Sequence, residues 1–176
     1  MANLRQLRTR VASIKNIQRV THAMQLVAAA RMRRAQDSIL AARPYAEELE
    51  SVLKKLSSSV EQGQQPLLSE RPVEAVALAV VTADRGLCGG FNTNICRMVA
   101  SEMQKLSDYR LELFTVGRKG RDYFRNRGHE ITCEHTDVFR MLEFSRAATI
   151  ARELTARFLS GAVDRVLLAY SEFRSV

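Results

Sequence analysis

The sequence predicts an α/β protein in which a long basic helix precedes a Rossmann-like, mostly parallel sheet with flanking helices. Two observations lead to this fold class. Apolar or small residues recur in the first 42 residues at a mean spacing of about 3.5, the period of a coiled-coil seam. From residue 73 onward, β-rich apolar runs alternate with helical segments over short connections. We therefore expect a helical arm (1–60), a linker (61–72) and an α/β globular domain (73–176).

The arm is predicted to be long, with a narrow apolar stripe. Forty helical residues span roughly 60 Å, because each residue adds about 1.5 Å. The stripe consists of Leu4, Leu7, Val11, Ile14, Ile17, Thr21, Met24, Ala28, Met32, Ala35, Ile39 and Ala42. Pro44 predicts a kink or break near Arg43, with helix resuming to about Leu56. A coiled-coil seam requires a second helix, so we expect a helical partner, either in trans or in a further part of the chain.

The excess positive charge lies in this arm. Residues 1–43 carry nine basic side chains and one acidic side chain, Asp37, and the chain as a whole has a net charge of +8. The basic residues are Arg5, Arg8, Arg10, Lys15, Arg19, Arg31, Arg33, Arg34 and Arg43. This asymmetry indicates an acidic partner, which can be nucleic acid, an anionic membrane face or an acidic protein surface. The basic N-terminus is not followed by an apolar signal core, so we expect a cytosolic chain.

The globular domain is expected to alternate strands and helices. The expected strands are residues 73–82, 109–117, 129–136 and 164–173, and the expected helices are residues 92–107, 118–128 and 142–161. We expect an Asn or Thr cap to open the first of these helices. The last helix should place Ala147, Ile150, Leu154 and Phe158 on one face.

The segment TADRGLCGGFN (82–92) joins the first strand to a helix, a place where α/β proteins often bind phosphate. Its glycines, Gly86, Gly89 and Gly90, do not form GxGxxG. No Lys-Ser/Thr pair follows the last glycine, so the segment is not a Walker A loop either. We expect a structural tight turn, or a contact loop that uses Arg85, and a nucleotide site is a further alternative.

No catalytic or metal constellation emerges from the spacing. The three cysteines, Cys88, Cys96 and Cys133, have no CxxC spacing, so we expect buried or idle thiols rather than a zinc site. The carboxylates are scattered over helical faces that we expect to be solvated. The basic segment 118–128 is compatible with a nucleic-acid patch, or with a solvated helix whose Tyr123 and Phe124 face the core.

Three stretches together resemble the gamma subunit family of the rotary F-type ATP synthase: residues 13–36 (SIKNIQRVTHAMQLVAAARMRRAQ), 84–92 (DRGLCGGFN) and 117–128 (GRKGRDYFRNRG). The resemblance implies a central rotor shaft that mechanically couples proton flow through the membrane sector to ATP synthesis or hydrolysis on the beta subunits. Such a shaft has no catalytic site and no cofactor of its own. The arm would be half of an antiparallel coiled coil, whose second helix lies beyond the residues of this chain.

The same resemblance implies partners and contact residues. The partners would be the alpha and beta subunits of the catalytic ring, the epsilon subunit and the c-ring, with no nucleic acid and with the membrane touched only through the complex. The location would be peripheral, on the cytoplasmic face of a bacterial inner or plasma membrane. The expected rotor–stator contacts are Met24, Arg31, Arg33, Arg34 and Arg85, and the expected contact loop contains Gly86, Cys88, Gly89 and Gly90. The alternatives are a basic-armed nucleic-acid-binding module and a small nucleotide-binding α/β protein.

Overall fold

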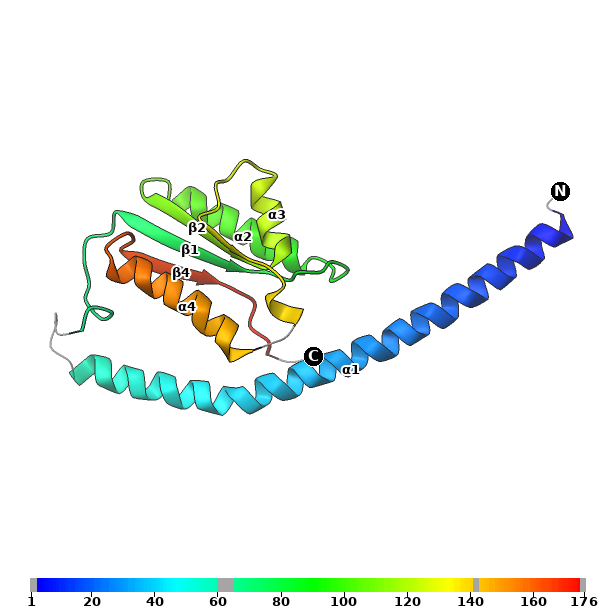
Figure 1. The fold of residues 1–176 in the computed structure, drawn as a ribbon, viewed down its shortest axis with the longest axis horizontal. Coiled ribbons are helices and arrows are strands. Elements are labelled where there is room, and N and C mark those ends of the chain that lie inside the picture. Colours follow the sequence, from blue (N-terminus) through cyan, green and yellow to red (C-terminus); the bar gives the residue numbers. More distant parts are fainter. Residues whose placement is uncertain (1–2, 60–64, 141–142, 175–176) are drawn as a thin grey trace. The chain divides into compact units, whose positions relative to one another are not determined.

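The computed structural model describes residues 3–59, 65–140 and 143–174, and the chain divides into two compact units, residues 1–60 and 61–176. The first unit consists of one helix, α1 (Leu4–Ser59), which curves along its length (Figure 1). Of the expected kink or break near Arg43, the break is wrong, because the helix continues through Pro44; the kink stays a prediction. Proline in a helix interior removes one backbone hydrogen bond and crowds the carbonyl four residues earlier, yet α1 retains its helical conformation on both sides of that position.

The second unit contains a four-stranded, fully parallel sheet in its described residues, with strand order β3-β2-β1-β4. The strands are β1 (Ala75–Val81), β2 (Arg110–Val116), β3 (Cys133–His135) and β4 (Arg165–Ala169). The helices are α2 (Phe91–Lys105), α3 (Arg118–Arg125) and α4 (Phe144–Leu159), with a short 3-10 helix, η1 (Val138–Arg140). This arrangement confirms the predicted Rossmann-like fold class, although β3 is shorter than expected.

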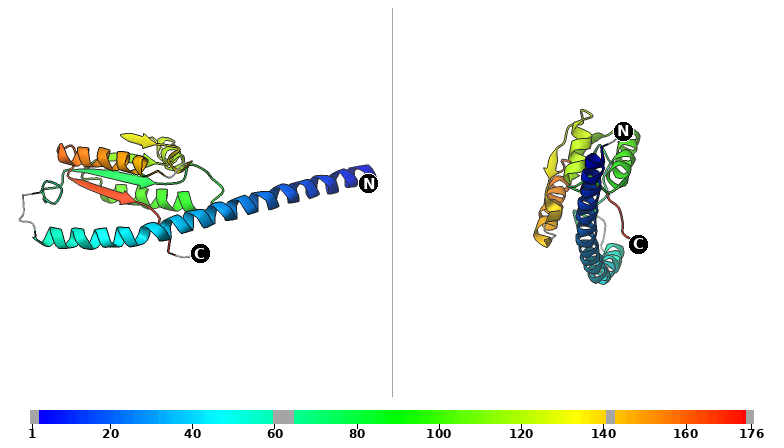
Figure 2. Two further views of the ribbon diagram at one scale, coloured as in Figure 1. Left: turned by 60° about the horizontal axis from the view of Figure 1, so that its bottom comes forward. Right: turned by 90° about the vertical axis from the view of Figure 1, so that its right-hand side faces the viewer.

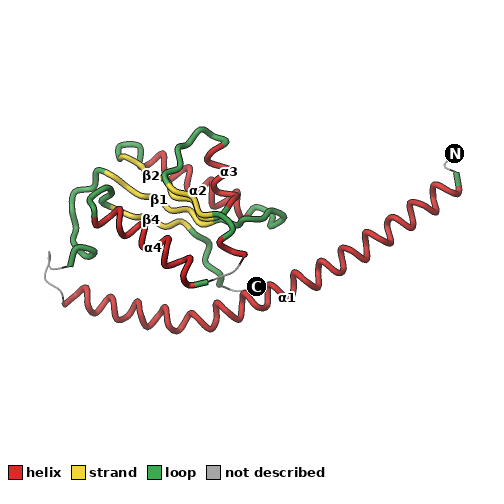
Figure 3. The backbone as a smooth tube through the Cα atoms, viewed as in Figure 1, coloured by secondary structure: helices red, strands yellow, loops and turns green. Residues whose placement is uncertain are grey.

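Two hydrophobic clusters cover the two faces of the sheet. Figure 2 shows α4 on one side of the sheet and α2 on the other, and Figure 3 shows the strands between them. On the α2 and α3 side, Leu78 and Val80 of β1 pack in one cluster with Val99 and the fully buried Phe124. On the other side, small residues of β1 form a second cluster with Phe114, against which Leu154 and Phe158 of α4 pack. The alternating side chains of β1 therefore serve both layers.

The start of β1 is fixed by a carboxylate that lies just before β4. Asp164 Oδ2 accepts hydrogen bonds from the backbone N–H groups of Glu74 and Ala75, each at 3.0 Å. Arg71 Nε lies 2.8 Å from Asp164 Oδ1, and its guanidinium stacks 4.5 Å above the Phe158 ring. The two backbone donors, and then Arg71, lower the pKa of Asp164. These bonds join the N-terminal ends of β1 and β4.

Candidate partner-binding surfaces

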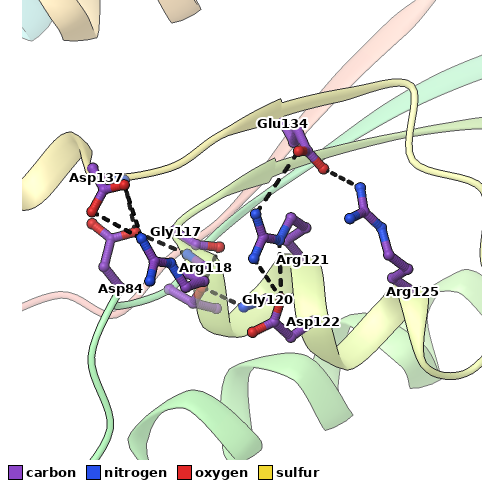
Figure 4. Close-up of polar contacts among 10 residues, drawn as sticks. Asp84, Gly117, Arg118, Gly120, Arg121, Asp122, Arg125, Glu134 and Asp137 are labelled. Atoms are coloured by element: carbon purple, nitrogen blue, oxygen red, sulfur yellow. Dashed lines mark hydrogen bonds and ion pairs between the residues drawn. The ribbon is translucent and has the colours of Figure 1, made fainter.

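The loop after β1 is anchored by two side chains that bind the start of α3. Asp84 Oδ1 accepts from the backbone N–H of Arg118 at 2.9 Å and from that of Asp137 at 3.0 Å (Figure 4). Thr82 Oγ1 accepts from the backbone N–H of Gly120 at 2.8 Å. Between these two residues of α3, the Lys119 N–H donates to the Ala83 carbonyl at 3.1 Å. Residues 82–84 therefore use the first three backbone donors of α3, which are the groups that an anion would need there.

The rest of this loop is a turn that holds itself in place. Asn92 accepts from the Ala83 N–H at 2.8 Å, and its amide donates to the Arg85 carbonyl at 3.4 Å and to Cys88 Sγ at 3.0 Å. The expected Asn or Thr cap of α2 is wrong, since Gly90 occupies the N-cap without a side-chain hydrogen bond. Asn92 is instead used to close the loop.

The turn presents two side chains to solvent. Leu87 is fully exposed and has a positive φ of 65°, and the neighbouring Arg85 is exposed as well. Of the four expected contact-loop residues, Gly89 also has a positive φ and Cys88 is an exposed free thiol. The geometry therefore matches an anchored turn with an exposed apolar and basic tip, which fits a protein contact better than a phosphate cradle.

The basic segment of α3 is largely neutralised by its own neighbours. Arg118 pairs with Asp137, while Arg121 and Arg125 both approach Glu134 (Figure 4). A further arginine of the segment, Arg127, stacks 3.6 Å from the centroid of the Tyr123 ring. Such paired guanidinium groups are poorly suited to bind phosphates, so the segment is the solvated helix with a core-facing Phe124 rather than a nucleic-acid patch.

The surface of α1 is unusual for its apolar content. None of its residues from 4 to 57 is buried, and many large apolar side chains are about half exposed. The exposed seam includes Leu4, Leu7, Val11, Ile14, Ile17, Met24, Met32 and Ile39. A continuous apolar stripe of this length is a surface for another helix.

The predicted contact residues of α1 do not all share one face. Met24 and Arg31 are seven residues apart, which places them within about 20° of each other around the helix. Arg34 lies about 80° from Met24 and Arg33 about 180° from it. All three arginines are exposed. Met24 and Arg31 therefore lie on the same side of α1, and Arg33 lies on the opposite side.

A second polar cluster joins β3 to α4. His135 Nε2 lies 2.9 Å from Glu153 Oε2, and Cys133 Sγ lies 3.2 Å from the same oxygen. Burial, followed by the interaction with Glu153, raises the pKa of Cys133 to about 11, so the thiol is protonated at neutral pH. Spacing alone did not predict this cluster. The two residues of β3 are separated by one position, but Glu153 comes from a helix 18 residues further along the chain.

The comparisons with known proteins are consistent along the whole chain. The family model described as ATP synthase matches residues 3–176. The ATP synthase gamma chain of Anaeromyxobacter dehalogenans (strain 2CP-C) is 44% identical over 99% of this chain, and that of Chlorobium phaeobacteroides (strain BS1) is 46% identical over all of it. The chain belongs to the ATP synthase gamma chain family. It spans 62% of the length of each of these two gamma chains.

Solved structures agree with the gamma chain fold. A chain in the central stalk and c-ring structure of the Tetrahymena thermophila mitochondrial ATP synthase aligns with a TM-score of 0.69 and 24% sequence identity. The alignment covers 89% of this chain and 66% of that chain. This likeness confirms the fold. Among the described residues, every helix is too short or too polar to cross a membrane.

Proposed function

We propose that this chain acts as part of the central rotor shaft of a proton-translocating F-type ATP synthase. The observation that carries the proposal is α1: a helix of 56 residues whose apolar seam is exposed along its length. Membership of the gamma chain family supplies the context, because the similar proteins are ATP synthase gamma chains. The shaft couples proton flow to ATP synthesis or hydrolysis on the beta subunits mechanically, without chemistry of its own.

In this proposal the seam of α1 packs against a second helix in an antiparallel coiled coil. The basic side chains at the edge of the seam and outside it meet acidic surfaces of the surrounding alpha and beta subunits. Exposed ion pairs contribute only about 0–1 kcal/mol each. Contacts of this strength guide the shaft without binding it permanently to one subunit, as rotation requires.

Two sites are the proposed points of contact with the catalytic ring. The first is the edge of the α1 seam at Met24 and Arg31, where these side chains can contact the ring beside the second helix, with Arg33 and Arg34 as weaker candidates. The second is the exposed tip at Arg85 and Leu87, which the anchored loop holds in one conformation. The backbone that shapes this tip is that of Gly86, Cys88, Gly89 and Gly90. The epsilon subunit and the c-ring are the further proposed partners, and the location is peripheral, on the cytoplasmic face of the membrane.

An assembly experiment tests the shaft function. The chain is fused to the part of the A. dehalogenans gamma chain that follows the matched region, and is coexpressed with the alpha and beta subunits of that organism. The extended chain should co-purify with both subunits and support ATP hydrolysis, because its added helix covers the seam. The 176-residue chain should be recovered poorly. Failure of the extended chain to bind alpha and beta subunits would contradict the proposal.

The contact residues are tested in the same complex. Arg31→Gln and Arg85→Gln should each lower ATP hydrolysis by up to about fivefold, as expected for loss of one partly exposed ion pair. Arg97→Gln is the matched control, because it removes the same charge from an exposed position of α2. Equal effects of all three substitutions would show that net charge, rather than these contacts, sets the rate.

A further inference from the structure

Three potential metal ligands converge where β3 meets α4. Cys133 and His135 are alternate residues of β3, so their side chains lie on the same face of the sheet, and Glu153 reaches them from α4. The three side chains are only partly exposed. They have no place in the proposed shaft contacts, which lie on α1 and in the loop after β1.

We propose that Cys133, His135 and Glu153 form a binding site for a divalent transition-metal ion of the zinc class. Cys, His and Glu are all ligands of zinc, and three protein ligands with one open position are typical of exchangeable or catalytic zinc sites. Thiolate and imidazole ligands favour zinc over magnesium or calcium, which prefer oxygen. When the ion binds, the Cys133 thiol releases its proton to solvent and coordinates as the thiolate.

The distances between the ligand atoms support this assignment. Cys133 Sγ lies 3.5 Å from His135 Nε2 and 3.2 Å from Glu153 Oε2, and His135 Nε2 lies 2.9 Å from the same carboxylate oxygen. In a tetrahedral zinc site, normal bond lengths place such ligand atoms about 3.4–3.6 Å apart. The three atoms need to separate by only a few tenths of an ångström, which ordinary side-chain rotations supply.

Open space for a fourth ligand adjoins the site on the side of His135. His135 lines an open cavity of about 390 Å³, together with Thr136, Arg146 and Thr149. The nearby guanidinium of Arg146 is bonded to the Asp137 carbonyl at 2.8 Å. The backbone of β3 is held by the Gly117 N–H, which donates to the His135 carbonyl at 2.8 Å. Two of the ligands, Cys133 and His135, therefore stand on a fixed strand, and His135 borders a space that water can enter.

Cobalt is a suitable probe for the site. The full 176-residue chain, treated with chelator and kept reduced, is titrated with Co²⁺, and absorption is followed for the bands of tetrahedral cobalt and for thiolate-to-cobalt charge transfer. We expect both signals to saturate at one cobalt per chain and to disappear when Zn²⁺ is added. Absence of charge transfer at saturating cobalt would overturn the proposal.

Substitutions identify the ligands. Cys133→Ser should abolish the charge-transfer band, and His135→Gln and Glu153→Gln should each weaken binding by at least the ~10–100-fold that loss of an outer-shell partner costs. Cys88→Ser and His129→Gln are the matched controls and should leave the titration unchanged. Circular dichroism establishes that each variant is folded. If a ligand variant does not fold, Cys88→Ser still tests whether the charge-transfer band comes from a cysteine outside the site. Charge transfer that survives Cys133→Ser, or is lost in Cys88→Ser, would refute the assignment.

Discussion

Two buried threonines provide a matched test of how hydrogen bonding stabilises the α/β unit. Thr82 and Thr115 are each almost fully buried, with 1% and 0% of their surface exposed. The Thr82 hydroxyl accepts from the Gly120 N–H at 2.8 Å. The Thr115 hydroxyl has no hydrogen-bond partner in the described part of the chain. Substitution by valine keeps the shape of each side chain and removes only the hydroxyl.

The expected effects have opposite signs. Thr82→Val leaves the buried Gly120 N–H without an acceptor, which costs about 1–3 kcal/mol of unfolding free energy. Thr115→Val removes a polar group that is buried without a partner, so it should be neutral or should stabilise the unit by about 1 kcal/mol. The two variants should therefore differ by roughly 1–4 kcal/mol.

The difference is measured by urea unfolding followed by near-UV circular dichroism. This signal reports the tyrosines, three of which lie in the α/β unit, whereas the far-UV signal is dominated by α1. Parallel transitions with equal slopes allow the midpoints to be compared directly. If Thr115→Val destabilises the unit as much as Thr82→Val does, the absence of a partner at Thr115 is not what distinguishes the two sites.

Two further predictions concern the same unit. Gly117→Ala should lower the unfolding free energy by more than about 3 kcal/mol. The reason is that Gly117 has a φ of 99° and an added Cβ would lie 2.0 Å from the Thr82 carbonyl oxygen. Gly128→Ala is the control and should lower the unfolding free energy less, because Gly128 has a positive φ but lies in open space. Asp164→Asn should lower the melting temperature at neutral pH. The folded state lowers the pKa of Asp164, so its contribution is present above the unfolded pKa and is lost as pH falls. The melting temperatures of wild type and variant should therefore begin to converge as pH falls below about 4, the unfolded pKa, and a constant difference down to pH 2 would contradict this reasoning.

Much of the architecture was predictable from local pattern. The apolar run of β1 and the glycines after β2 and α4 indicated the alternation of strands and helices, and the 3.5-residue seam indicated a long helix with exposed apolar positions. The continuation of α1 through Pro44 was not predictable, because local propensity cannot show that helix formers on both sides maintain the helix. The Asn92 side chain was assigned to a helix cap, but it bonds across the loop. An asparagine side chain can accept from the backbone N–H groups at the start of a helix or from those of a loop. Only the tertiary structure decides which of the two it does.

The sequence by itself determined the α/β class, the basic and apolar arm, and the likeness to the gamma chain family. These properties depend on periodicity, charge and short motifs, which are local. Only the tertiary structure decided that Asp84 and Thr82 take the first donors of α3, that the arginines of α3 are paired, and that Glu153 meets Cys133 and His135. Each of these arrangements joins residues from different elements. Packing of the parallel strands and their helices brings such residues together, and spacing along the chain does not encode that proximity.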